Sequence, residues 1–476
     1  MDFLSLTFAI FFIISVICYY AVPKKLRWGI LLISSLLFYV WSVPYLVVYL
    51  LFSAVTTFGY GKWAEQHQEK GKGILAAVIA TNLAVLLVLK FYPLCETRFG
   101  FPAFKLLMPM GVSFYTLQVI AYCVDVSQGK TEAQKNFLKY LLFVSFFPQI
   151  LQGPIPRYEQ LKGQLFEGHS FDYRRVKFGF QLILWGMFLK MVIADRAAIF
   201  GNTVFPEYHL YAGGILAVAA VLYSIQLYTD FLGCVCIAMG AAEVYGIHLQ
   251  TNFERPYLAV SVKDFWRRWH ISLSRWLRDY VYIPLGGNRK GKVRRFVNLM
   301  LTFLVSGIWH GSGMQYLFWG AMQGGYQIAG ELLMPVRKKV RALFKLEEDM
   351  PLLILWQRAC TFVLITISWV IFRSASLRSG LSMLKRIFTD ITPWVFFDGS
   401  LFTCGITKHS FIALLLMIVL VAIIEHRQEK DNLRETLEKQ HGIVRWCIYL
   451  SAIALIAVLG VYGPGYDATQ FLYGQF

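Results

Sequence analysis

His270 and His310 are the residues whose type and setting point most directly to chemistry. Both lie within residues 262–313, a stretch that opens with a basic, tryptophan-rich segment and closes on Trp309, His310 and a glycine. An imidazole titrates near neutral pH, so a histidine in a polar cavity is well suited to act as a general base. These two histidines are therefore the catalytic candidates of the chain.

The segment around His270 predicts a basic amphipathic helix. With Trp266 at zero and about 100° per residue, His270 and its aromatic and leucine neighbours fall within an arc of about 120°. The basic side chains lie outside this arc, as in helices that rest in a membrane interface, and we expect them to face the cytoplasm. A histidine on an apolar face can also be purely structural, and that alternative stays open for His270. The candidates for binding a donor or substrate here are Arg267, Arg268, Trp269, Arg275, Trp309 and, in the following turn, Asn288.

The run from Phe296 to Trp309 is apolar and ends at the glycines after His310. About fourteen residues at a rise of about 1.5 Å reach roughly 21 Å, less than the hydrocarbon thickness of about 30 Å. We therefore expect a short helix that ends inside the bilayer, with His310 at its broken end. His270 and His310 would then mark two depths of one tunnel rather than a contacting pair.

The composition predicts an all-α polytopic membrane protein. The chain is 57% hydrophobic and only 16% charged, whereas soluble domains carry about a quarter of charged residues. Its net charge of +18 suits contact with anionic headgroups or an anionic substrate. We expect eleven to thirteen true spanning helices, some of them broken or re-entrant. The candidate runs are roughly 3–22, 27–42, 44–60, 73–92, 106–125, 136–153, 174–195, 210–228, 231–248, 296–310, 314–332, 352–373, 408–424 and 445–462.

Basic loops predict the orientation of the chain. Lys24, Lys25 and Arg27 follow the first run, and Lys70 and Lys72 follow the third. Because cytoplasmic loops are enriched in lysine and arginine, we expect an extracytoplasmic N-terminus.

Polar residues inside apolar runs are further candidates. Gln149 lies in the proline- and glycine-rich segment 146–157, and Pro109 and Gly111 interrupt another run. Broken backbone at membrane depth must be buried in protein or line a polar cavity, so we expect an internal cavity. Asp230 follows a long apolar run and is a functional candidate, since charge inside a bilayer is costly. The weaker candidates of this kind are Asp125, Glu243 and His248, the last two with helix-end positions as the alternative.

Several other kinds of chemistry are not indicated. The eight cysteines form no CxxC pair and lie mostly in apolar runs, so we expect small core residues and no metal site. Nucleotide-binding, zinc-protease and GxSxG motifs are absent from the sequence, and no bound cofactor is expected. The aromatic and arginine residues at 265–280 do not indicate nucleic-acid binding in a chain this apolar.

Five ordered motifs resemble the membrane-bound O-acyltransferase (MBOAT) superfamily, in its bacterial alginate O-acetyltransferase-like branch. They are PMGVSFYTLQVIAYCVDV (109–126), FVSFFPQILQGPIPR (143–157), the long basic signature at 252–289, GIWHGSG (307–313) and FLYGQF (471–476). The resemblance covers roughly 100 to 476. It implies a ring of helices around a central funnel, with peripheral helices in 1–100, a catalytic core in 101–400 and further membrane helices in 401–476.

The resemblance also implies an activity. His310 would be catalytic and His270 supporting, in acyl transfer, most simply of acetyl, from a cytoplasmic thioester to a cell-envelope polysaccharide. The donor would be acetyl-CoA or an acyl carrier protein. An SGNH-type extracytoplasmic protein would be a partner, and the location would be the bacterial inner membrane.

One departure and two alternatives accompany this resemblance. The branch commonly has a motif like DFSGYSD where this chain has Asp230 followed by FLGCVC (231–236), which puts the acetyl assignment in doubt. The first alternative is D-alanyl transfer from a carrier protein to teichoic acid. The second is a proton-coupled transporter, since broken helices and buried polar residues also suit transport.

Overall fold

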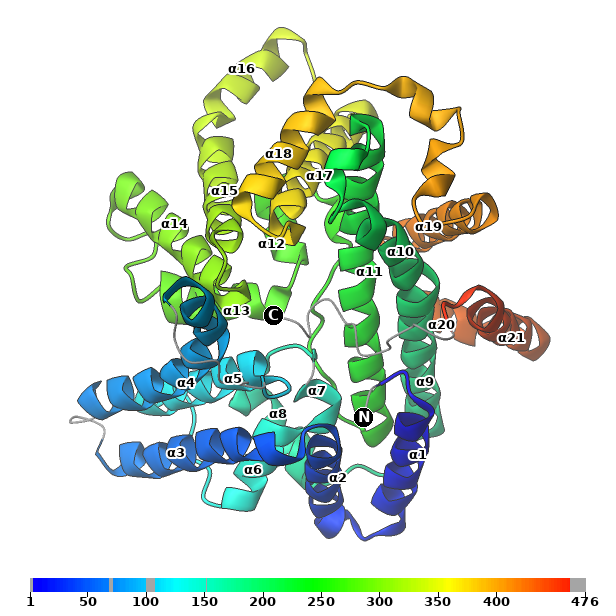
Figure 1. Cartoon of the computed structure of the whole chain (residues 1–476). Coiled ribbons are helices and arrows are strands. Elements are labelled where there is room, and N and C mark those ends of the chain that lie inside the picture. Colours follow the sequence, from blue (N-terminus) through cyan, green and yellow to red (C-terminus); the bar gives the residue numbers. More distant parts are fainter. Residues whose placement is uncertain (1–2, 68–71, 100–107, 151, 463–476) are drawn as a thin grey trace. The chain divides into compact units, whose positions relative to one another are not determined.

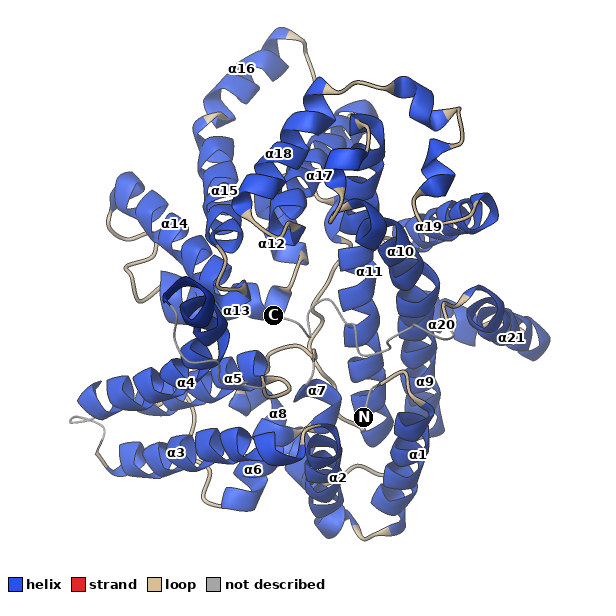
Figure 2. Ribbon diagram, in the orientation of Figure 1, coloured by secondary structure: helices blue, strands red, loops and turns tan. Residues whose placement is uncertain are grey.

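Every regular element in the described part of the chain is a helix (Figure 2), as the composition predicted. The computed structural model describes residues 3–67, 72–99, 108–150 and 152–462, so FLYGQF (471–476) and Lys70 lie outside the described residues. The helices gather into two compact units. The three-part division at 100 and 400 stays a prediction of the resemblance.

The first unit comprises Met1–Met187 and Cys234–Gln250 within the described chain (Figure 1). Its helices are α1 (Leu6–Ala21), α2 (Arg27–Ser42), α3 (Val47–Gln66), α4 (Lys72–Phe99), α5 (Val112–Ser127), α6 (Phe137–Ser145), α7 (Phe147–Ile150), α8 (Tyr158–Glu167) and α9 (Tyr173–Met187).

The second unit comprises Phe188–Gly233 and Thr251–Pro464. It begins with a π-helical turn, Phe188–Ala194, that continues α9 into α10 (Asp195–Val204), and α11 (Gly213–Tyr245) supplies residues to both units. The central helices are α12 (Val262–Arg268), α13 (Ile271–Leu277), a second π-helical turn (Arg278–Tyr282), α14 (Gly291–His310), α15 (Met314–Leu332), α16 (Met334–Leu343) and α17 (Pro351–Arg373). The last are α18 (Leu377–Thr389), α19 (Lys408–Gln428), α20 (Leu433–Glu438) and α21 (Gly442–Leu459).

Seven helical segments of the described chain are long and apolar enough to cross a membrane, so the protein is a multi-pass membrane protein. They are Pro44–Gln66, Lys72–Tyr92, Tyr173–Val204, Gly213–Tyr245, Pro351–Arg373, Lys408–Gln428 and Gly442–Leu459, with two shorter apolar helices at Leu6–Ala21 and Val112–Ser127. This number is below the expected eleven to thirteen, in part because 210–228 and 231–248 form one helix, α11. The separation expected between them is wrong, since a glycine alone does not stop a helix and Asp230 has a buried partner, described below.

The two predicted backbone breaks in the first unit are confirmed. Gly111 begins α5 with φ at 69°, and an added Cβ there would strike the carbonyl oxygen of Ile150. In the second break, α6 ends at Ser145 and the one-turn α7 precedes the irregular segment 152–157. The second break is buried within protein, as irregular backbone must be in a membrane chain, whereas in the first break Pro109 is buried and Met108 is exposed.

Glycines bring the backbones of α14 and α15 together. A Cβ on Gly307 would strike the carbonyl oxygen of Tyr316, and one on Gly320 would strike the carbonyl oxygen of Phe303. The two helices therefore pack as one antiparallel hairpin, in the manner of membrane helices that meet through small residues. This hairpin positions the end of α14, where His310 lies.

Candidate active site

His310 is the last residue of α14 and is 2% exposed. Gly311 follows in extended backbone, so the predicted helix end at a glycine is confirmed. The helix begins at Gly291, however, five residues before the expected start, because Lys292 and Arg295 extend it as good helix formers. Its 20 residues reach about 30 Å, but the first turns carry Lys292, Arg294 and Arg295, and α14 is not among the helices of the described chain that are long and apolar enough to cross a membrane. The expectation that its apolar part ends inside the bilayer stays a prediction. The depth of His310 in a bilayer stays a prediction.

Three aromatic rings surround the imidazole of His310. Its ring centroid lies 4.8 Å from Trp309, 5.1 Å from Trp319 on α15 and 5.3 Å from Phe372 on α17. Trp319 and Phe372 are themselves buried. Surroundings this poor in water screen charge weakly, so a proton held here interacts strongly with charge that develops on a reacting group.

The chain is not helical at His270, and the prediction of one continuous amphipathic helix is wrong. α12 ends at Arg268 and α13 begins at Ile271, while His270 takes the left-handed conformation with φ at 43° and ψ at 55°. Asn252 stabilises this break. Its Oδ1 accepts hydrogen bonds from the backbone N–H and the hydroxyl of Ser272, at 3.0 and 2.9 Å, and lies 3.3 Å from Nδ1 of His270. A side chain 18 residues earlier thus decides the local conformation.

The apolar side of this segment packs against protein, not in a membrane interface as predicted. Trp269 is 1% exposed and lies 5.0 Å from Phe253, 5.3 Å from Phe265 and 5.2 Å from Trp369, measured between ring centroids. Aromatic pairs at these separations stabilise the folded chain beyond the effect of the area they bury. This stabilisation favours a buried position for the apolar face over a position in the membrane interface.

His270 is 1% exposed and neutral at ordinary pH, because burial lowers its pKa to about 3. A neutral imidazole has one nitrogen that donates a hydrogen bond and one that accepts it. With Nδ1 turned to Asn252, the ring is oriented by a defined partner. Asn252 was not among the predicted site residues, although it opens the signature at 252–289; its role depends on a contact that spacing along a helix does not indicate.

Trp309 connects the two histidines. Its ring centroid lies 6.1 Å from that of His270 and 4.8 Å from that of His310, so the two imidazoles are no farther apart than the sum of these distances. Phe231 also packs against His270, with the two ring centroids 4.9 Å apart. The structure therefore brings His270, Trp309 and His310 into one buried cluster, while the tunnel between two depths stays a prediction.

The predicted donor-binding residues lie mostly on the surface near this cluster. Arg267, Arg275 and Asn288 are exposed, and Asn288 accepts a hydrogen bond from the hydroxyl of Tyr282. Arg268 pairs with Asp264 at 3.1 Å. Of this predicted set, Trp269 and Trp309 are the buried members.

Gln149 belongs to the first unit. It is 2% exposed and donates a hydrogen bond to Oε1 of Gln118 at 3.1 Å, and Gln118 donates to the carbonyl oxygen of Phe143 at 2.6 Å. These bonds join the broken segment after α6 to α5. Within this unit Gln149 therefore satisfies buried polar groups at a backbone break, and its part in substrate binding stays a prediction.

Asp230 lies 1% exposed in the middle of α11 and forms an ion pair with Lys190. The Lys190 Nζ lies 2.6 Å from Asp230 and 2.7 Å from Asp195, and both partners are almost fully buried. Lys190 is in the π-helical turn Phe188–Ala194, a kind of irregularity that is frequent at functional sites. Sequence reasoning missed Lys190 and Asp195; a lysine and an aspartate within an apolar run were the signal that could have found them.

The weaker candidates are less buried than expected. Asp125 is half-buried and lies 3.9 Å from Lys130, and His248 is exposed just past the end of α11. Glu243 is half-buried near that end, so the helix-end alternative holds for this pair. Within the described residues no group of His, Cys, Asp or Glu has the arrangement of a metal site.

Comparisons with known proteins agree on one family. Residues 133–376 match the model of the MBOAT, membrane-bound O-acyltransferase family. The chain is 35% identical over 388 residues to a probable alginate O-acetylase of Pseudomonas syringae pv. tomato, covering 78% of this chain and 72% of that protein. It is 35% identical over 393 residues to a peptidoglycan O-acetyltransferase of Helicobacter pylori, covering 75% and 72%. A teichoic acid D-alanyltransferase of Bacillus subtilis is 29% identical over 300 residues, covering 60% and 72%.

Proposed function

The chain belongs to the membrane-bound O-acyltransferase family and is an acyltransferase, and from this premise we propose that it moves an acetyl group onto a cell-envelope polysaccharide. The donor is a cytoplasmic thioester, acetyl-CoA or an acetylated carrier protein. His310 is the catalytic residue and His270 supports it. The enzyme lies in the bacterial inner membrane with an extracytoplasmic N-terminus, and an SGNH-type protein outside the membrane completes the transfer.

The observation that carries this proposal is the pairing of two buried imidazoles through Trp309 at the broken end of α14. Trp319 and Phe372 form a buried aromatic wall around the imidazole of His310, which lies beside the non-helical backbone that begins at Gly311. Arg267 and Arg275 on the exposed side of the same segment supply positive charge for an anionic donor.

The reaction needs one base and one acid. His310 takes the proton from an acceptor hydroxyl, whose oxygen attacks the thioester carbonyl and forms the new C–O bond. The tetrahedral intermediate collapses by breaking the C–S bond, and the imidazolium returns its proton to the leaving thiolate. The neutral His270 stabilises the arrangement as an oriented hydrogen-bonding group, with Asn252 fixing its ring.

Acetyl transfer in proteoliposomes tests this assignment. With acetyl-labelled donor, the SGNH-type partner and a polysaccharide acceptor, we expect His310→Gln to lower the rate by about 10²–10⁴-fold, the usual contribution of general acid–base catalysis. His248→Gln is the matched control, because His248 is exposed and far along the chain from α14. A folded His310→Gln protein with undiminished transfer would overturn the role of His310.

D-alanyl transfer is the second candidate, favoured by the relation to the teichoic acid D-alanyltransferase and by the replaced segment 231–236. The same proteoliposomes distinguish the two. Release of labelled acetyl from acetyl-CoA supports the first, and release of D-alanine from a charged carrier protein supports the second.

A further inference from the structure

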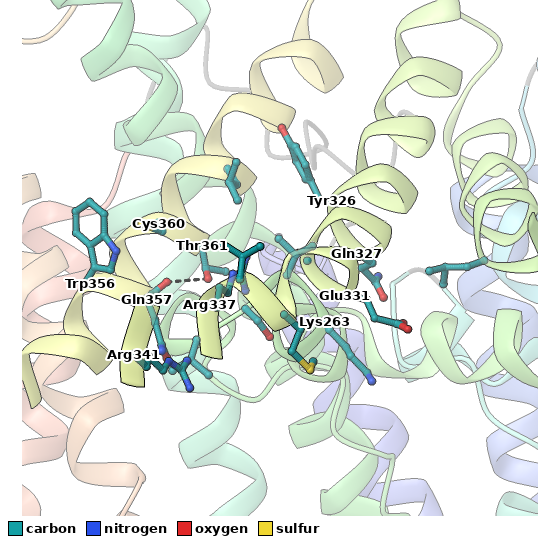
Figure 3. Close-up of a pocket in the computed structure, with 18 of the residues that line it drawn as sticks. Lys263, Tyr326, Gln327, Glu331, Arg337, Arg341, Trp356, Gln357, Cys360 and Thr361 are labelled. Atoms are coloured by element: carbon teal, nitrogen blue, oxygen red, sulfur yellow. Dashed lines mark hydrogen bonds between the residues drawn. The ribbon is translucent and has the colours of Figure 1, made fainter. Parts of the chain in front are cut away.

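A cavity of about 970 Å³ lies among α14, α15, α16 and α17 (Figure 3). Its volume is near the upper end of the range for small-molecule sites, about 300–1,000 Å³. Neither catalytic candidate lines it, and of the residues predicted to bind the donor or substrate Asn288 alone does. Arg295 in its wall is fifteen residues before His310 on α14, which corresponds to about 22 Å along the helix. The cavity is therefore a separate site at the other end of the α14–α15 hairpin.

Four basic side chains line this cavity: Lys263, Arg295, Arg337 and Arg341. In the view of Figure 3, Arg341 lies beside Gln357 on one side, Lys263 and Glu331 lie on the other side, and Tyr326 lies away from all three. Glu331 pairs with Arg295, which also lines the cavity. Arg341 pairs with Glu348 at 2.6 Å, outside the lining.

Two cations of the lining remain without a carboxylate. Lys263 at the start of α12 and Arg337 on α16 form no ion pair with any other residue that the structure describes. Two uncompensated cations in a shared wall favour an occupant with a phosphate group, since a phosphate accepts several charge-assisted hydrogen bonds.

Most of the remaining wall is apolar and continues onto the outer surface of α17. Leu353 and Leu364 line the cavity, as does Trp356, which is 66% exposed. Next to them Leu352 and Leu355 are 79% and 63% exposed on a helix that is apolar enough to cross a membrane. A helix surface of this kind is suited to lipid tails, so the apolar wall of the cavity adjoins a part of α17 that can face the bilayer.

α16 forms the rest of the wall and has the composition of a helix that lies on a membrane surface. Its basic residues include Arg337, Lys338 and Lys339, and its apolar Val336 and Val340 are 55% and 45% exposed. Basic amphipathic helices of this kind bind anionic lipid headgroups.

We propose that this cavity is a binding site for one anionic phospholipid, distinct from the site of acyl transfer. The phosphate lies between Lys263 and Arg337, and an acyl chain follows Trp356 and Leu364 along α17. The apolar wall favours a lipid that enters sideways from the bilayer, because the two cations and the apolar side chains of α17 line the same cavity. The bound lipid joins α16 to the α14–α15 hairpin.

Native mass spectrometry of the full-length protein in neutral detergent tests whether Lys263 and Arg337 bind the phosphate. Titration with dioleoylphosphatidylglycerol is compared for the wild type, the double variant Lys263→Ala/Arg337→Ala and the matched control Lys338→Ala/Lys339→Ala, which removes two charges of α16 outside the lining. Each basic residue near an anionic lipid contributes about fivefold, so we expect roughly thirtyfold weaker binding of the tightest lipid for the first pair alone. Equal losses for both pairs would overturn the site.

Two glycines of α15 test the cavity itself. An added Cβ on Gly330, which lines the cavity, or on Gly325, which does not, meets no atom within 4 Å. We expect Gly330→Phe to fill the cavity and abolish retention of the tightest lipid, and Gly325→Phe to retain it. Bound lipid that survives Gly330→Phe, or that is displaced by acetyl-CoA rather than by a second phospholipid, would overturn the proposal. Because these readouts measure binding, they stand apart from the acyl-transfer assay.

Discussion

The buried charges of Lys190, Asp195 and Asp230 give the sharpest stability prediction. Lys190→Met removes the cation and leaves two carboxylates at 8% and 1% exposure. Removal of one partner from a buried ion pair costs about 3–5 kcal/mol, because the remaining charge is uncompensated. For a unit of roughly 250 residues, each kcal/mol lowers Tm by about 2 °C, so we expect a fall of about 6–10 °C.

The assay is thermal unfolding of the purified protein in detergent, followed by tryptophan fluorescence. The control is Arg278→Ala, which breaks the exposed Arg278–Asp279 pair and should cost less than about 1 kcal/mol. The triple variant Lys190→Met/Asp195→Asn/Asp230→Asn carries no charge at this place and should recover most of the lost Tm. A triple variant no more stable than Lys190→Met would refute the reasoning, since the loss would then come from packing rather than from uncompensated charge.

Three further predictions concern His270, its partner Asn252 and the α14–α15 hairpin. Since burial depresses the pKa of His270 to about 3 from its usual 6.5, the folded state binds a proton less readily than the unfolded state. The free energy of unfolding is therefore highest above about pH 6.5 and should fall by about 2 kcal/mol between there and pH 5. Denaturant unfolding at both pH values measures this fall, and we expect His270→Gln to abolish it. Asn252→Ala leaves the buried N–H of Ser272 without its acceptor, and we expect a loss of about 1–3 kcal/mol in the same melts together with a lower kcat at unchanged KM in acyl transfer. Gly320→Val should prevent the close approach of α15 to α14 and lower Tm, whereas Gly325→Val, which meets open space, should not; equal melting of the two would contradict the packing account.

Much of the site could be predicted where local sequence decides the structure. Gly311 after an apolar run marks the end of α14, and Gly111 marks the start of α5, since each ends or begins a helix through its own backbone. The break at His270 could not be predicted, because it depends on the side chain of Asn252, which lies 18 residues earlier and outside both α12 and α13.

A contact with another element also explains why α11 is one helix where two spans were expected. The expected spans 210–228 and 231–248 lie on either side of Asp230, and an isolated aspartate is costly in an apolar helix. Its partner Lys190 belongs to another helical segment, and this pairing allows α11 to continue through the position. Patterns of hydrophobicity describe one element at a time, whereas both differences arise from contacts between elements.

The left-handed backbone of His270 also decides which mutant alleles are informative. An L-residue with a Cβ costs about 1–2 kcal/mol in this conformation, and glycine does not. An alanine allele would therefore lose the imidazole while keeping the unfavourable backbone, so a fall in its cellular abundance would be mistaken for a catalytic effect. A glycine allele removes the ring and the strain together. Because both alleles lose the buried contacts of the ring with Phe231 and Trp309, the glycine allele should accumulate better than the alanine allele while both transfer less, which would separate the effect of the backbone from that of the imidazole.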